Sequence, residues 1–127
     1  MLKLENVSSF YGESLAINKI NLEINEGSFH GILGKNGMGK STLLKTIMGL
    51  MTKTNGSIHL AEKNISKLKT HDRAIEGLGY VPQGRGIMPQ YTIEENMIIG
   101  TFARDKDSAN NVNEDFEFTL KLFPILK

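Results

Sequence analysis

The most informative stretch of this sequence is Gly34-Lys35-Asn36-Gly37-Met38-Gly39-Lys40-Ser41-Thr42. Its first eight residues match the pattern G-x-x-x-x-G-K-[ST], in which backbone N–H groups surround phosphate oxygens. The glycines permit positive φ angles and let a ligand approach the backbone closely. Lys40 is placed to reach the outer phosphates, and the hydroxyl of Ser41 is placed to ligate Mg²⁺. The stretch therefore predicts a loop that binds a triphosphate together with Mg²⁺.

The residues on either side of this loop have the patterns of a strand and of a helix. Phe29–Leu33 is a largely apolar segment that can form a strand. After Ser41 the apolar residues recur at helical spacing, at Leu43, Leu44, Ile47 and Leu50. Strand, glycine loop and helix thus follow one another in the order that the motif requires. The start of the helix adds unpaired N–H groups and the positive end of its dipole to the loop.

Further strands and helices are predicted outward from this unit. Apolar and polar residues alternate over 2–4 and 20–24, which is typical of half-buried strands. Asn25-Glu26-Gly27 predicts a turn, and Asn55-Gly56 predicts a tight turn before a strand at 57–61. The other predicted elements are a helix at 71–76 capped by Thr70, a buried strand at 78–81, a helix from Thr92 to about Ile99 with Glu95 completing a capping box, and a helix at 112–123 after a loop at 104–113.

The composition excludes several classes of protein. The chain has 127 residues, a formal net charge of +1 and no cysteine. We therefore expect no nucleic-acid partner, no disulfide scaffold and no thiolate metal site. The three histidines show no metal-ligand spacing. Because the longest apolar run is short and the N-terminus lacks a basic start, we also expect neither a membrane span nor a signal peptide.

Three motifs resemble the nucleotide-binding subunits of ATP-binding cassette (ABC) transporters: Tyr11-Gly12, Gly34 to Thr42, and Leu78-Gly79-Tyr80-Val81-Pro82-Gln83-Gly84-Arg85. Within that family the chain is most similar to importers of branched-chain amino acids and their urea-transporting relatives. That similarity is carried by His71, Arg73, residues 80–85, Met88-Pro89 and Thr92-Ile93-Glu94-Glu95-Asn96. As the transported solute, urea is slightly favoured over an amino acid by two stretches, Tyr11-Gly12-Glu13-Ser14 and Leu44-Lys45-Thr46-Ile47-Met48-Gly49. This subunit does not itself touch the solute.

The resemblance implies a set of functional residues. Tyr11 would stack on the adenine base of ATP, with Phe10 as the alternative. Gln83 would meet Mg²⁺ and the attacking water, so the catalytic residues are Lys40 and Gln83 and the metal ligands are Ser41 and Gln83. Met38 stands where the family usually has a small residue, but that position contributes backbone. The implied nucleotide-binding set is Tyr11, Gly34, Lys35, Asn36, Gly37, Met38, Gly39, Lys40, Ser41 and Thr42.

The resemblance also implies partners and a location. Gly84 to Gly100 would lie against transmembrane permease subunits, with Ile87, Met88 and Tyr91 either in that contact or in the core. Arg85 is either a partner contact or a solvated loop residue. A second nucleotide-binding subunit would pair head to tail with the first, and a periplasmic or surface solute-binding protein would act indirectly. The protein would lie in the cytoplasm, on the inner face of the membrane.

These observations together predict an α/β fold, namely part of a P-loop NTPase core with an N-terminal antiparallel β subdomain of the ABC ATPase type. Residues 1–127 would form the N-terminal part of one such domain, and 92–127 would begin its helical subdomain. The family's signature loop, catalytic glutamate and switch histidine come later than this segment in the family's order. We therefore expect 1–127 alone to bind ATP weakly, to hydrolyse it negligibly, and to self-associate through an unpaired strand edge. The alternatives are a soluble cassette ATPase of DNA repair or translation, and a non-catalytic fragment.

Overall fold

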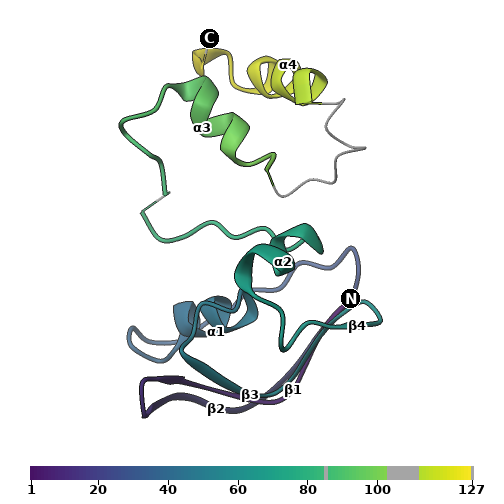
Figure 1. Ribbon diagram of the computed structural model, residues 1–127, viewed down its shortest axis with the longest axis vertical. Helices are drawn as coiled ribbons and strands as arrows, with labels where there is room; N and C mark the ends of the chain where they lie inside the picture. The colour runs from purple at the N-terminus through teal and green to yellow at the C-terminus, as the bar shows by residue number, and fades with distance from the viewer. Residues whose placement is uncertain (85, 103–111, 127) are drawn as a thin grey trace. The chain divides into compact units, whose positions relative to one another are not determined.

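The computed structural model describes residues 1–84, 86–102 and 112–126. The chain forms two compact units, Met1–Tyr80 and Val81–Lys127, each of which is described by itself. The first unit contains a four-stranded sheet and two helices, and the second unit is helical (Figure 1). Among the described residues, no helix combines the length and the apolar character needed to cross a membrane.

The sheet of the first unit is antiparallel, with strand order β2-β1-β3-β4. Its strands are β1 (Leu2–Tyr11), β2 (Ser14–Ile24), β3 (Lys53–Leu60) and β4 (Lys63–Asn64). β1 and β2 form a hairpin in which Tyr11 pairs with Ser14. The alternation at 2–4 and 20–24 therefore predicted two real strands, and together they place Tyr11 at the tip of the hairpin.

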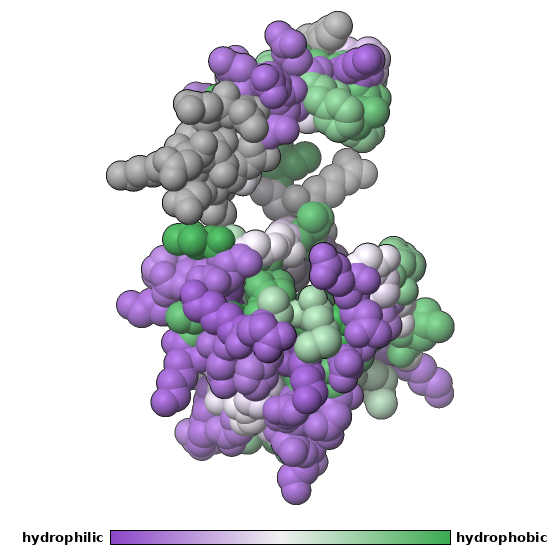
Figure 2. Space-filling view, turned by 90° about the vertical axis from the view of Figure 1, so that its right-hand side faces the viewer, coloured by the Kyte–Doolittle hydropathy of each residue, from purple (hydrophilic) through white to green (hydrophobic). Residues whose placement is uncertain are grey.

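The core of the first unit lies between the sheet and helix α1 (Lys40–Ile47). Its fully or nearly buried members are Leu4, Val7, Ile47, Ile58 and Ile65. Leu44 and Leu50, which share the predicted apolar face, are instead 41% and 48% exposed. Helix α2 (Thr70–Ile75) includes Thr70, so the predicted cap is wrong: Lys69 is the N-cap and the Thr70 hydroxyl donates to the Gly49 carbonyl at 3.1 Å. Figure 2 shows that hydrophilic residues predominate on the visible face of this unit.

Gly56 lies inside β3, so the tight turn predicted at Asn55-Gly56 is wrong. The strand continues because β1 is irregular at the same place: Asn6 has a φ of 49° and the register shifts between Glu5 and Ser8. A Cβ on Gly56 would lie 2.5 Å from the Asn6 carbonyl oxygen, and the φ of Gly56 is +89°. The glycine thus serves a close approach between two strands.

Gly56→Ala is expected to destabilise the first unit by about 2 kcal/mol or more, because both the clash and the positive φ oppose a side chain there. Gly27→Ala is the matched control: Gly27 has a φ of +68°, but a Cβ at this position would meet nothing within 4 Å. It should lose only about 1 kcal/mol from the backbone conformation. Urea unfolding of both variants measures the difference, and equal losses would show that the close contact is unimportant.

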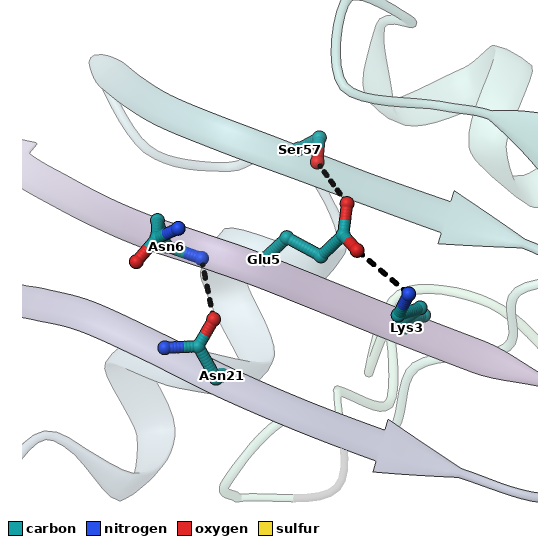
Figure 3. A network of polar contacts seen from close by, with 5 residues as sticks. All are labelled: Lys3, Glu5, Asn6, Asn21 and Ser57. Atoms are coloured by element: carbon teal, nitrogen blue, oxygen red, sulfur yellow. Dashed lines mark hydrogen bonds and ion pairs between the residues drawn. The ribbon is translucent and has the colours of Figure 1, made fainter.

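A polar network covers part of the sheet (Figure 3). The Glu5 carboxylate accepts from the Lys3 ammonium at 2.6 Å and from the Ser57 hydroxyl at 3.1 Å. The Lys3 bond and then the Ser57 bond lower the pKa of Glu5, and Glu5 raises the pKa of Lys3. Separately, the Asn21 side-chain oxygen accepts from the backbone N–H of Asn6 at 2.9 Å, which satisfies the irregular position of β1.

This network predicts a pH dependence of stability. Because the pKa of Glu5 is lower in the folded state, its contribution is present above the unfolded pKa and is lost as the pH falls through the folded pKa. Glu5→Gln should therefore reduce the loss of stability between pH 6 and about pH 3, measured by urea unfolding at low salt. Glu26→Gln removes the same charge from an exposed turn, and an equal reduction in that variant would contradict the assignment.

Two predicted strands are absent. The segments 29–33 and 78–81 have no strand assignment, and Phe29, Leu33 and Val81 are 98%, 95% and 82% exposed. A strand needs a hydrogen-bonded neighbour, and none of the described residues pairs with these segments. The predicted unpaired strand edge is therefore not formed, and the tendency to self-associate stays a prediction, supported now by the exposed apolar side chains.

The second unit contains α3 (Ile93–Ile99), α4 (Val112–Leu122) and a 3₁₀ turn, Pro124–Leu126. The capping box is confirmed: the Thr92 hydroxyl accepts from the Glu95 N–H at 3.2 Å, and the Glu95 carboxylate accepts from the Thr92 N–H at 2.8 Å. The helix predicted at 112–123 is also confirmed, whereas most of the loop predicted at 104–113 lies outside the described residues.

Candidate functional site

The glycine loop leads directly into α1, as the motif predicts. Gly34, Gly37 and Gly39 all have positive φ angles, of 156°, 82° and 88°. A turn closes the middle of the loop, where the Met38 N–H donates to the Lys35 carbonyl at 3.3 Å. The Met38 side chain is 73% exposed, so this residue contributes its backbone to the loop and directs its side chain to solvent.

Gly39 joins the loop to the helix. It is the N-cap of α1 in a left-handed conformation, and a Cβ there would lie 3.0 Å from Ile17 Cγ2. No side chain caps α1, and its first turn contains no acidic residue. The first backbone bond of the helix runs from Leu43 N–H to the Gly39 carbonyl at 2.8 Å. The preceding N–H groups of the first turn therefore remain available to an anion, at the positive end of the helix dipole.

The Lys40 side chain turns back over the loop. Its ammonium donates to the Gly34 carbonyl at 2.6 Å and to the Lys35 carbonyl at 2.8 Å. A cation, the glycine backbone and the uncapped start of α1 thus meet within one short segment. This set of donors, which contains no carboxylate, suits a polyphosphate.

The next two residues complete the helix start. Ser41 is exposed, and Thr42 is partly buried, with its carbonyl accepting from the Thr46 hydroxyl at 2.7 Å. Among the described residues, no group of three or more His, Cys, Asp and Glu side chains is arranged to hold a metal ion. A Mg²⁺ ion here would therefore take the Ser41 hydroxyl together with phosphate and water oxygens, which is a ligand set that Mg²⁺ accepts.

The two aromatic candidates at the end of β1 face opposite ways. The Ser9 and Thr46 hydroxyls are hydrogen-bonded at 2.8 Å, so Ser9 points towards α1. The pairing of β1 with β2 shifts between Ser9 and Phe10, but its pairing with β3 is regular from Ser8 to Phe10. Alternation of side chains along β1 therefore indicates that Tyr11 lies on the face of Ser9 and Phe10 on the opposite one. The Lys53 ammonium lies 5.3 Å from the centre of the Phe10 ring. Tyr11, which is 50% exposed, therefore stands on the face that carries the loop and the helix.

Arg73 supports α1 from its other end, a role that the sequence did not indicate. Its guanidinium is almost completely buried and donates to the carbonyls of Thr46, Ile47, Ser66 and Leu68 at 2.6–3.1 Å. A Cβ on Gly49 would lie 3.0 Å from Arg73 Nε. Burial lowers the pKa of Arg73 from its usual value. The guanidinium thus satisfies the last carbonyls of α1, and a lone arginine in a short helix gives no sign of this in the sequence.

The remaining candidates belong to the second unit. Gln83 is exposed in a turn with Gly84, and Arg85 lies outside the described residues. Ile87, Met88 and Tyr91 are all exposed and, with other residues of the second unit, line a cavity of about 420 Å³. The Asn96 side chain fixes this segment through bonds to the backbone of Met88, Tyr91 and Thr92. Of the alternatives left open for the apolar residues, their exposure favours a contact surface over a core.

Sequence comparison identifies relatives of this chain. Residues 17–126 match the family model described as "ABC transporter". The chain is 34% identical over its whole length to the high-affinity branched-chain amino acid transport ATP-binding protein BraG of Pseudomonas aeruginosa, and covers 53% of it. It is 33% identical over its whole length to the probable branched-chain amino acid transport ATP-binding protein LivF of Archaeoglobus fulgidus, and covers 52% of it. The chain therefore spans about half the length of these relatives.

Relatives named for other solutes and solved structures agree with this assignment. The chain is 38% identical to the maltose/maltodextrin import ATP-binding protein MalK of Escherichia coli. This match covers 78% of the chain and 26% of MalK. The solved structure of a dimeric bacterial ABC transporter cassette has a TM-score of 0.75 and 30% sequence identity to this chain. The match covers 95% of this chain and 56% of the cassette's chain. A post-hydrolysis dimer bound to ADP and Pi has a TM-score of 0.71, with 30% identity over 84% of this chain and 49% of its own. The predicted fold class is confirmed, and this chain belongs to the ABC transporter family.

Proposed function

We propose that this chain is the nucleotide-binding part of an importer's ATP-binding subunit, which binds MgATP. The observation that carries the proposal is the Lys40 ammonium, held over the glycine loop at the uncapped start of α1. Family membership and the importer names of the relatives support it.

Each residue of the loop has a proposed role. The phosphates are bound by the backbone N–H groups of the loop and of the start of α1, namely those of Gly34, Lys35, Asn36, Gly37, Met38, Gly39, Lys40, Ser41 and Thr42. The Lys40 ammonium leaves the loop carbonyls and binds the outer phosphates. The Ser41 hydroxyl would ligate Mg²⁺, whose charge would offset that of the phosphates. Gln83 would meet the metal and the attacking water, as the resemblance implies. Tyr11 is the residue that stacks on adenine, because it shares the face of α1 whereas Phe10 is turned towards Lys53.

Hydrolysis is proposed only for a complete cassette. Phosphoryl transfer needs charge stabilisation and a group that orients water. The sequence has no Leu-Ser-Gly-Gly-Gln stretch, and the family's catalytic glutamate follows that signature. Residues 1–127 alone should therefore bind ATP weakly and hydrolyse it negligibly. We also propose that 1–127 forms the N-terminal part of one ATPase domain, with the start of its helical subdomain at 92–127.

The partners and the solute follow from the same proposal. Permease subunits would contact the segment 84–100, a second cassette would pair head to tail, and the protein would act at the inner face of the membrane. The two relatives BraG and LivF, each matched over the whole chain, are named for branched-chain amino acid transport, which supports an amino acid solute. Urea is the competing solute, and uptake of labelled leucine against labelled urea by the assembled transporter distinguishes them.

The proposed function is tested by titration calorimetry of the chain with MgATP. We expect saturable binding of one nucleotide, and much weaker binding of AMP, because AMP lacks the outer phosphates that Lys40 would meet. Absence of heat with MgATP from a chain whose circular dichroism shows it to be folded would overturn the proposal. ATP turnover by 1–127 that Lys40→Ala abolishes would overturn the expected inactivity.

A further inference from the structure

We propose that Thr52 is a positioning residue that holds Tyr11 in place for the adenine base. The inference rests on the proposed function, since it takes Tyr11 as the residue on which the adenine base stacks. We call the Tyr11 ring the platform. Thr52 lies in the segment between α1 and β3 and makes no part of the phosphate loop. Its effect would therefore be on recognition of the base and not on binding of the phosphates.

A single hydroxyl connects Thr52 to both neighbours of Tyr11. Thr52 Oγ1 accepts from the Gly12 N–H at 3.0 Å and donates to the Phe10 carbonyl at 2.8 Å. β3 begins only at Lys53, which pairs with Phe10, so no backbone of β3 lies beside Tyr11. The Thr52 side chain thus takes the place of the next strand residue and fixes the backbone on each side of Tyr11.

The surroundings leave Tyr11 itself free while its neighbours are held. The Lys53 ammonium contacts the Phe10 ring on the opposite face of the strand, and Tyr11 remains half-exposed. Arg73 holds the last carbonyls of α1, which lies only a few residues before Thr52. The segment that leaves the phosphate-loop helix therefore ends on the hairpin that carries the platform. A platform fixed before binding loses less conformational freedom when a base stacks on it.

The test compares Thr52→Val with Thr52→Ser in the full chain. Valine keeps the shape of the side chain and removes the hydroxyl, whereas serine keeps the hydroxyl. Affinities for MgATP and for magnesium tripolyphosphate, which has no base, are measured by titration calorimetry. We expect Thr52→Val to weaken MgATP binding about three- to tenfold, to leave tripolyphosphate binding unchanged, and to be rescued by serine. A purely structural role would change both affinities together.

Tyr11→Ala separates this inference from the proposed function. In the Tyr11→Ala background, Thr52→Val should have no further effect on MgATP binding, because the platform is already absent. If Thr52→Val binds MgATP like the wild type, or weakens both ligands equally, the inference is overturned although the proposed function stands. If the folded wild type binds neither ligand, the proposed function fails and the inference with it.

Discussion

Lys40→Ala is expected to weaken MgATP binding by about 100-fold or to abolish it. Hydrogen bonds from a charged group contribute about 1.5–3 kcal/mol each, and two such bonds to phosphate oxygens correspond to at least this factor. The thermal stability of the variant should change little, because the carbonyls of Gly34 and Lys35 that accept from Lys40 are exposed and can bind water instead. Titration calorimetry measures the affinity, and circular dichroism checks the fold.

Lys45→Ala is the matched control for this prediction. Lys45 lies in the last turn of the same helix, so the variant loses the same charge from the same element but away from the loop. It should bind MgATP within about twofold of the wild type, since the Lys45 charge lies away from the loop and salt screens charges over such a separation. Equal losses of affinity in both variants would mean that general electrostatics, and not the position of Lys40, governs binding.

Arg73→Leu should destabilise the first unit by about 3 kcal/mol or more. The substitution removes a donor from four carbonyls. The buried Ile47 carbonyl and the part-buried Ser66 and Leu68 carbonyls lose this donor, whereas the Thr46 carbonyl keeps the Gly49 N–H. A buried carbonyl left without its donor costs about 1–3 kcal/mol. For a domain of this size the midpoint of thermal unfolding should fall by roughly 10 °C or more. MgATP binding should weaken as well, because the end of α1 is no longer held.

Two further variants make this measurement decisive. Lys67→Leu makes the same change of residue class at an exposed position and should unfold within about 1 kcal/mol of the wild type. Arg73→Lys keeps the charge but cannot bond with two branches at once, so it should recover little of the lost stability. A melting temperature of Arg73→Leu close to that of the wild type would contradict the role assigned to the buried guanidinium.

The features that could be predicted from the sequence are those that depend on neighbouring residues. The phosphate loop, the first two strands and the capping box at Thr92 are all specified within about ten residues, by spacing, alternation or side-chain type. The choice of Tyr11 over Phe10 needed the structure, because contacts such as the bond between Ser9 and Thr46 show which face of β1 meets α1.

The features that could not be predicted depend on residues far apart in the chain. Segment 29–33 has the composition of a strand, but composition does not supply the neighbour that a strand requires. Gly56 resembles a turn residue until the irregular position of Asn6 on the facing strand is known. Arg73 resembles an ordinary surface arginine, since its buried state follows from carbonyls that two separate segments bring together, the end of α1 and the segment before α2.

Because Gly49 and Arg73 are in close contact, the residue at one position limits which residues the other position can accept. Glycine at 49 meets two demands, a φ of +75° and the guanidinium close beside it. A lineage that exchanged the arginine for a short residue would remove the second demand, after which asparagine, which tolerates such a φ, could replace the glycine. The reverse order would meet a steric barrier, and the first order begins with the loss of four hydrogen bonds from Arg73. Either first step is costly, so we expect evolution to keep or to exchange the two residues together.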